Sequence, residues 1–121
     1  MIPPIAQICL DDAGVRAVFG TAPMRVYAFG TVEKLPAPPY SLWQTIGGQP
    51  GWFLAQRPDT DGFTTQHDVY AADPDSLVAA VKALRDAFEP HGYISRWGHQ
   101  IKDPDTKLFR YSFDVDWLIP R

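Results

Sequence analysis

The chain has 121 residues, and its composition is that of a single globular domain. Hydrophobic residues make up 45% of the sequence, including four Trp, five Tyr and seven Phe, which is enough to form a compact core. The formal net charge is −3 at pH 7. Because general nucleic-acid binders usually carry a basic surplus to contact phosphates, this charge balance argues against that class.

The cysteine content and the first residues bear on the compartment. Cys9 is the only cysteine, so an intrachain disulfide and a multi-cysteine zinc site are excluded. The opening residues lack the basic leader and long apolar run of a signal peptide. No stretch approaches the ~20 apolar residues that cross a bilayer. We therefore expect a soluble protein that is made in a reducing cytoplasm.

The apolar residues of the N-terminal segment fall at helical spacing. Within Pro4–Phe19 they recur every three or four residues, and Asp11–Gly14 interrupts the stripe. We predict one helix to about Leu10 and a short second helix capped by Asp12. Cys9 lies on the apolar stripe, which favours a buried, unreactive thiol.

Three strands are predicted in the middle of the chain, over Arg25–Phe29, Tyr40–Ile46 and Phe63–Ala71. Leu35–Pro39 is rich in proline and cannot supply regular ladder donors, so it is predicted to be an extended connector. Gly47–Gly62 is rich in glycine, proline and aspartate, which predicts a long loop.

The last third of the chain predicts a helix and a hairpin. Capping residues begin the helix at Asp73, and helical spacing of apolar residues continues to Phe88. The hairpin strands are Tyr93–Ile101 and Leu108–Trp117. The resulting order, α-β-β-β-α-β-β, predicts a single α+β domain. Its mainly antiparallel, mixed sheet carries the N-terminal helix and the one long helix on one face.

Residues with catalytic or metal-binding chemistry are sparse. His67, His91 and His99 lack the spacing of a metal motif, and we expect ordinary surface or interface histidines. Most aspartate pairs lie in predicted turns and caps, where carboxylates accept backbone hydrogen bonds. The sequence contains neither a nucleophile elbow nor a phosphate-binding glycine loop. We therefore expect neither an enzyme nor a metal or cofactor site.

Large apolar side chains in the predicted Gly47–Gly62 loop are the feature that local structure leaves unexplained. Such residues either fold back onto their own domain or contact a partner, and we favour a partner. The apolar residues close to Arg121 form a second candidate segment. The interface candidates from both segments are Trp52, Phe53, Leu54, Arg57, Trp117 and Leu118.

The order of several short motifs is more informative than any one of them. The motifs are Val15–Gly20, Arg25–Tyr27, Pro38–Tyr40, Trp43-Gln44, Gln66–Ala71, Ala79–Phe88 and Asp103–Arg110. In this order and spacing, over nearly the whole chain, the sequence resembles the tail-completion, or tail-terminator, proteins of long-tailed phages and gene-transfer particles.

This resemblance implies a structural role. Family members form a ring, usually of six subunits, on the head-proximal end of the finished tail tube. The ring stops further polymerisation of tube protein and offers a surface to the head's connector. The implied partners are further copies of the chain, the tail tube protein and the connector or neck protein. No cofactor, active site or membrane contact is implied, and the location is the virion.

The last predicted strand contains one further candidate site. Asp114 and Asp116 line its exposed face, where they repel one another and form either a solvated face or part of an acidic ring lumen. An acidic lumen would let DNA pass without specific binding, by repulsion.

Two alternative functions stay open. One is a head-side neck or connector protein, and the other is a small cytoplasmic ligand-binding or enzymatic domain.

Overall fold

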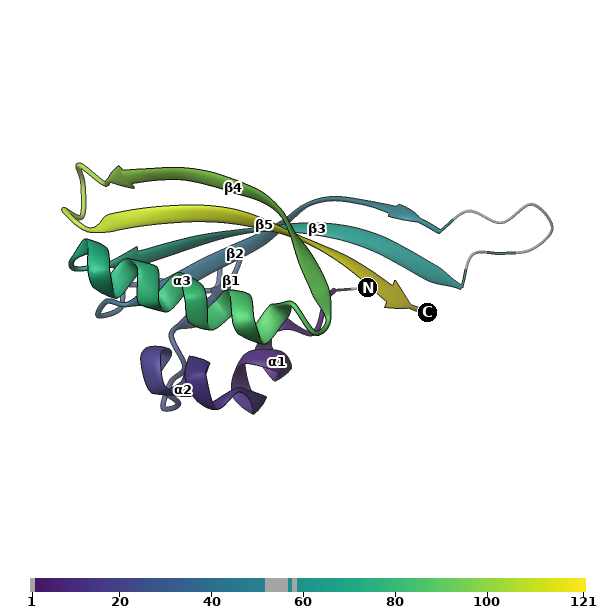
Figure 1. The fold of residues 1–121 in the computed structure, drawn as a ribbon, viewed down its shortest axis with the longest axis horizontal. Helices are drawn as coiled ribbons and strands as arrows, with labels where there is room; N and C mark the ends of the chain where they lie inside the picture. The colour runs from purple at the N-terminus through teal and green to yellow at the C-terminus, as the bar shows by residue number, and fades with distance from the viewer. Residues whose placement is uncertain (1, 52–56, 58) are drawn as a thin grey trace.

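The protein is described by a computed structural model, which covers residues 2–51, 57 and 59–121. It contains three helices and a five-stranded sheet (Figure 1). The elements in chain order are α1 (Ile5–Asp11), α2 (Ala13–Phe19), β1 (Val26–Ala28), β2 (Tyr40–Pro50), β3 (Thr60–Ala71), α3 (Pro74–Phe88), β4 (Gly92–Lys102) and β5 (Phe109–Pro120). The predicted α+β class and element order are confirmed, with the N-terminal helix divided into two.

The sheet has the strand order β1-β2-β3-β5-β4. Only β1 and β2 run parallel, and every other neighbouring pair is antiparallel, so the sheet is mixed, as predicted. The long strands β3 and β5 pair over their full lengths, from Thr60 opposite Pro120 to Ala71 opposite Phe109. This pair lies in the interior of the sheet, with β2 beside β3 and β4 beside β5.

The two N-terminal helices are separated by one capping residue. The Asp12 carboxylate accepts a hydrogen bond from the Val15 N–H at 2.9 Å and thereby starts α2, as predicted. Asp73 caps α3 in the same way, through the Ser76 N–H at 2.8 Å. None of the described helices is long and apolar enough to cross a membrane.

The core lies between the helices and one face of the sheet. Residues of odd number on β3 and β5 face the helices, because side chains alternate along a strand. Cys9 of α1 is buried there, which confirms the predicted burial of its thiol, and this burial raises the pKa of the thiol to about 12. The fully buried side chains of this layer include Ile5, Val15, Phe19, Val69, Leu84, Phe88, Phe113 and Val115.

The prediction of a loop over Gly47–Gly62 is wrong at both ends. β2 continues to Pro50, and β3 begins at Thr60, so the two strands form a hairpin whose arms pair from Tyr40 opposite Tyr70 to Pro50 opposite Asp61. Residues 44–50 are exposed. Figure 1 shows both arms, together with the end of β5, extending past α3 and away from the helices.

Candidate assembly surfaces

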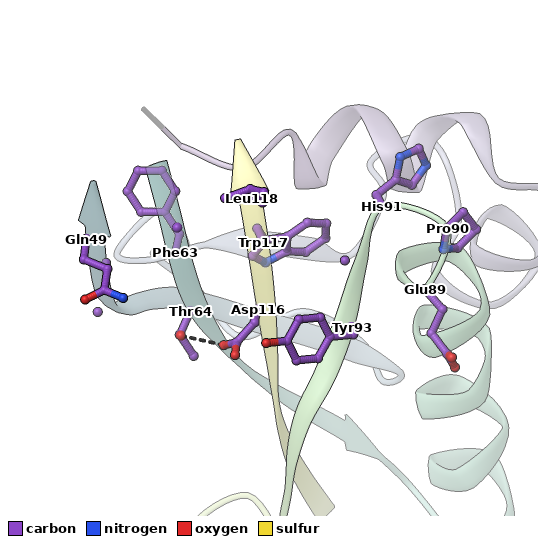
Figure 2. A pocket seen from close by; sticks show the side chains of 14 residues that line it. Gln49, Phe63, Thr64, Glu89, Pro90, His91, Tyr93, Asp116, Trp117 and Leu118 are labelled. Carbon is purple, nitrogen blue, oxygen red and sulfur yellow. Dashed lines mark hydrogen bonds between the residues drawn. The ribbon is translucent and has the colours of Figure 1, made fainter. Parts of the chain in front are cut away.

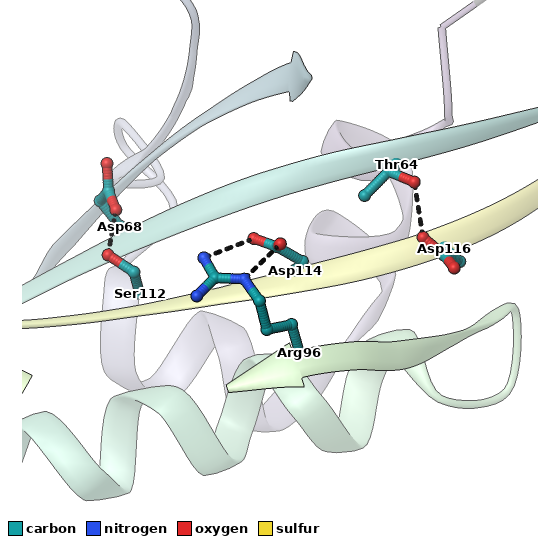
Figure 3. Close-up of polar contacts among 6 residues, drawn as sticks. All are labelled: Thr64, Asp68, Arg96, Ser112, Asp114 and Asp116. Atoms are coloured by element: carbon teal, nitrogen blue, oxygen red, sulfur yellow. Dashed lines mark hydrogen bonds and ion pairs between the residues drawn. The ribbon is translucent and has the colours of Figure 1, made fainter. Parts of the chain in front are cut away.

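The sheet face that the helices leave open is polar. Its central carboxylate is Asp114, whose side chain is only 8% exposed and is paired with the Arg96 guanidinium at 2.8 Å (Figure 3). The predicted exposure of Asp114 is wrong for its side chain. The irregular β4–β5 pairing puts Arg96 directly opposite it and covers it.

Asp116 lies on the same face and is more accessible than Asp114. Its carboxylate accepts a hydrogen bond from the Thr64 hydroxyl at 2.6 Å. Tyr93 also hydrogen-bonds to Asp116, and this bond is the largest cause of the raised pKa of the Tyr93 phenol. The predicted repulsion between Asp114 and Asp116 is therefore weakened, because each carboxylate has its own donor.

Other polar side chains of the open face are also paired with hydrogen-bond partners. Ser112 donates a hydrogen bond to Asp68 on the neighbouring strand (Figure 3). Tyr40 and Tyr70 stack with ring centroids 4.9 Å apart, and Tyr70 hydrogen-bonds to Arg110. The face thus carries three carboxylates, on Asp68, Asp114 and Asp116, against the guanidiniums of Arg96 and Arg110. It is weakly acidic rather than strongly so.

The residues near Arg121 divide between the core and the surface. Trp117 is only 3% exposed, and its indole N–H donates to the Thr65 hydroxyl at 2.8 Å. Its side chain is therefore a core component, contrary to its selection as an accessible interface residue. Leu118, one residue later on the opposite face of β5, is 66% exposed. Arg121 pairs with Asp61 at 2.9 Å and holds the end of β5 against β3.

The other predicted interface residues lie in the segment between the hairpin arms. Trp52, Phe53 and Leu54 are outside the described residues. Arg57 is described and is exposed.

A groove of about 710 Å³ lies beside residues 47–49 and 62–64 of the hairpin arms (Figure 2). Figure 2 shows that its lining comes from all four long strands and from the turn after α3. Phe63 and Trp117 supply apolar surface, while Asp116, Tyr93 and Glu89 supply polar groups. The groove was not predicted from the sequence, because its lining combines segments that are distant in the chain.

His67 is the one histidine that the sequence analysis misplaced. It was expected at a surface or interface, but its side chain is fully buried among the rings of Trp43, Phe88 and Phe113. Its Nε2 atom lies 2.8 Å from the Thr65 hydroxyl, and Nδ1 has no hydrogen-bond partner among the described residues. Burial lowers the pKa of His67 to about 3, so the imidazole is neutral in the folded protein.

The Trp117–Thr65–His67 chain is a structural motif of the core. An indole N–H can only donate, so the Thr65 hydroxyl oxygen accepts a hydrogen bond from Trp117. The same hydroxyl forms a second hydrogen bond with His67 Nε2, in the direction that the imidazole tautomer sets. All three side chains are buried. Among the described residues, no group of three or more His, Cys, Asp or Glu side chains is arranged to hold a metal ion.

The chain is similar to known proteins in both sequence and fold. Among solved structures, the chain is similar to a component of the virion of a native gene transfer agent particle. The TM-score is 0.64 at 15% sequence identity, covering 97% of this chain and 92% of the other. At this identity the similarity shows a shared fold. A search of curated proteins found no match. The profile of the family described as tail completion protein gp17 matches residues 3–120, and the chain therefore belongs to this family of structural tail proteins.

Proposed function

We propose that the chain caps the head-proximal end of the tail tube as a ring of six copies, ends tube polymerisation and forms the surface that joins tail to head. The observation that carries this proposal is the match to the tail completion family over residues 3–120. In this function the partners are other copies of the chain, the tail tube protein and the neck protein. The ring is assembled in the host cytoplasm and acts without a cofactor or catalysis.

The one-sided sheet supports this function. All three helices lie on one face, whereas the opposite face is polar and has its own hydrogen-bond network. A wall that passes DNA must avoid gripping phosphates, and a weakly acidic face with paired arginines satisfies this requirement. We therefore propose the open face as the lumen wall. Asp116 is its accessible carboxylate, and Asp114 is the neutralised partner of Arg96.

Charge reversal at Asp116 tests the lumen assignment. We expect Asp116→Lys to slow DNA release from assembled particles severalfold, because an added cation would hold the phosphate backbone. Asp116→Asn keeps a hydrogen-bond acceptor for Thr64 and should release DNA nearly as the wild type does. Release is measured by dye fluorescence after particles are triggered. If Asp116→Lys particles fail to assemble, Asp116 lies at an interface instead.

The hairpin is the proposed contact with the tube or with a neighbouring copy. Its arms extend beyond α3, which exposes residues 44–50 and Arg57. We expect the double variant Trp52→Ala/Phe53→Ala to fold normally but to lose ring formation or tail binding, because large apolar side chains commonly dominate interface energy. Sedimentation with purified tails and thermal unfolding measure the two properties. Val78→Ala, at an exposed apolar position on α3, is the control. Wild-type assembly by the double variant would contradict the assignment.

A further inference from the structure

The sheet has two free edges, and they are different from one another. On one side, β1 covers β2 only from Ser41 to Trp43, so residues 44–50 of β2 have no strand partner on that side among the described residues. On the other side, β4 is the terminal strand of the sheet over Gly92–Lys102. A free edge presents unpaired N–H and C=O groups that readily accept another strand.

Hydrogen bonds already present show which groups of β2 face outward. The Ser41 N–H donates outward to the Arg25 carbonyl, and alternation places the Thr45 N–H on the same side. The Gly51 N–H donates inward to Thr60, so alternation places the N–H of Gly48 outward, beyond the register shift between Thr45 and Gly47. Pro50 follows, and its missing N–H ends the set of available donors.

The β2 edge also lacks the usual protection. Edge strands are commonly guarded by charged residues, but Gln44–Gln49 contains no charged residue, and Ile46 is exposed. Phe29, beside β1, adds a second exposed apolar side chain on this side of the sheet. An uncharged, partly apolar edge in a soluble protein favours a strand partner in the assembled state.

We propose that residues Gln44–Gln49 of one copy pair, by strand addition, with β4 of the next copy around the ring. This inference rests on the proposed ring. A contact between two unlike edges is head-to-tail and closes into a ring when the rotation between neighbouring copies closes, whereas β2 against β2 would stop at two copies. Charge also favours unlike edges. β4 carries Arg96 and Lys102 and no acid, so β4 against β4 would bring only cations together.

The surface area that a stable interface must bury indicates that side chains also take part in the contact. Six paired residues span about 20 Å, and main-chain pairing alone falls short of the about 800 Å² per partner that a stable interface buries. The exposed apolar side chains that flank the edges must therefore contribute, namely Phe29 and Ile46 on one copy and Tyr93, Trp97 and Ile101 on the next. Sheets joined in this way place every open polar face on one side of the ring wall and every helix layer on the other.

Disulfide trapping tests the contact directly. Ile46→Cys is combined in turn with Ser95→Cys, Trp97→Cys or His99→Cys in one chain, because paired strands bring Cα atoms within disulfide range. Cys9 is buried and does not interfere. Particles whose only copy of the chain is the variant are oxidised and analysed on non-reducing gels. We expect at least one combination to give a ladder that ends at the covalently closed ring.

Two controls make the outcomes distinct. Ile46→Cys alone should give no ladder, and Ile46→Cys with Leu10→Cys, at an exposed position on α1, should give none either. If electron microscopy shows a ring but no combination gives a ladder, the edge contact is overturned and the ring stands. A dimer formed by Ile46→Cys alone would overturn it in favour of β2 against β2. Particles without any ring at the tail end would overturn the proposed function and this inference together.

Discussion

Replacing Trp117 with alanine should lower the free energy of unfolding by about 3–5 kcal/mol, as expected for truncation of a large buried aromatic side chain. The indole packs edge to face against Phe88, with ring centroids 5.4 Å apart and an interplanar angle of 71°. Its removal also leaves the Thr65 hydroxyl without a donor. Urea unfolding followed by circular dichroism measures the change.

Leu118 is the matched control for Trp117. It is the next residue in the sequence, but its side chain lies on the opposite face of β5 and is exposed. Leu118→Ala should change the free energy of unfolding by about 0.5 kcal/mol or less. Leu118 is also one of the predicted interface residues, and if it contacts a partner, Leu118→Ala should nevertheless weaken assembly. A stable Trp117→Ala protein, or an unfolded Leu118→Ala protein, would contradict the division between core and surface at this end of β5.

Acidification should destabilise the isolated protein through His67. The folded-state pKa of about 3 lies below the value of 6.5 for an ordinary histidine, so the unfolded chain takes up a proton first as the pH falls. The full stability contribution is present above pH 6.5 and is lost progressively toward pH 3. The slope is about 1.4 kcal/mol per pH unit, so we expect a loss of about 2 kcal/mol between pH 6.5 and pH 5.

The variant His67→Gln isolates this effect. It is less stable at neutral pH, because the aromatic cluster loses a ring, but its stability should be nearly constant between pH 6.5 and pH 5. His91→Gln, at an exposed position, should keep the wild-type slope. Urea titrations at several pH values compare the three proteins. An identical pH dependence in wild type and His67→Gln would show that this imidazole is not the group responsible.

The sequence predicted most elements of the fold because their signals are local. The cap at Asp12, the helix after Asp73 and the alternation along β5 each depend on residues that are near one another in the chain. The same alternation places His67 and Trp117 on the core face, with Val69 and Val115. Both residues were assigned to surfaces because of their residue type. Their odd-numbered positions, shared with the buried valines, would have placed them correctly in the core.

The ends of the hairpin arms were predicted as a loop because glycine is common in turns. Glycine also occurs within strands, where two backbones approach closely. A Cβ atom on Gly48 would lie 2.8 Å from the Phe63 ring and 2.9 Å from the Gly62 carbonyl oxygen. Glycine at this position therefore permits close approach of the two arms and does not end the strand. Pro50 is tolerated in β2 for a different reason: it lacks a backbone N–H, and at this position an N–H would point to the free edge and not toward β3.

The candidate surfaces were less predictable than the fold, since they depend on register between distant segments. Asp114 is covered by Arg96 only because β4 pairs with β5 in an irregular register, and no local pattern shows this. The insertion of β5 between β3 and β4 is equally non-local. It creates both the groove beside the hairpin and the position of β4 as a free edge.

Electron microscopy of particles made without this chain tests the central claim most directly. If the chain caps the tube, its loss should give overlong or unjoined tails beside filled heads, and expression of the wild-type chain in trans should restore tails of uniform length. Tails of normal length beside heads that leak DNA would contradict the claim and place the chain on the head side of the joint.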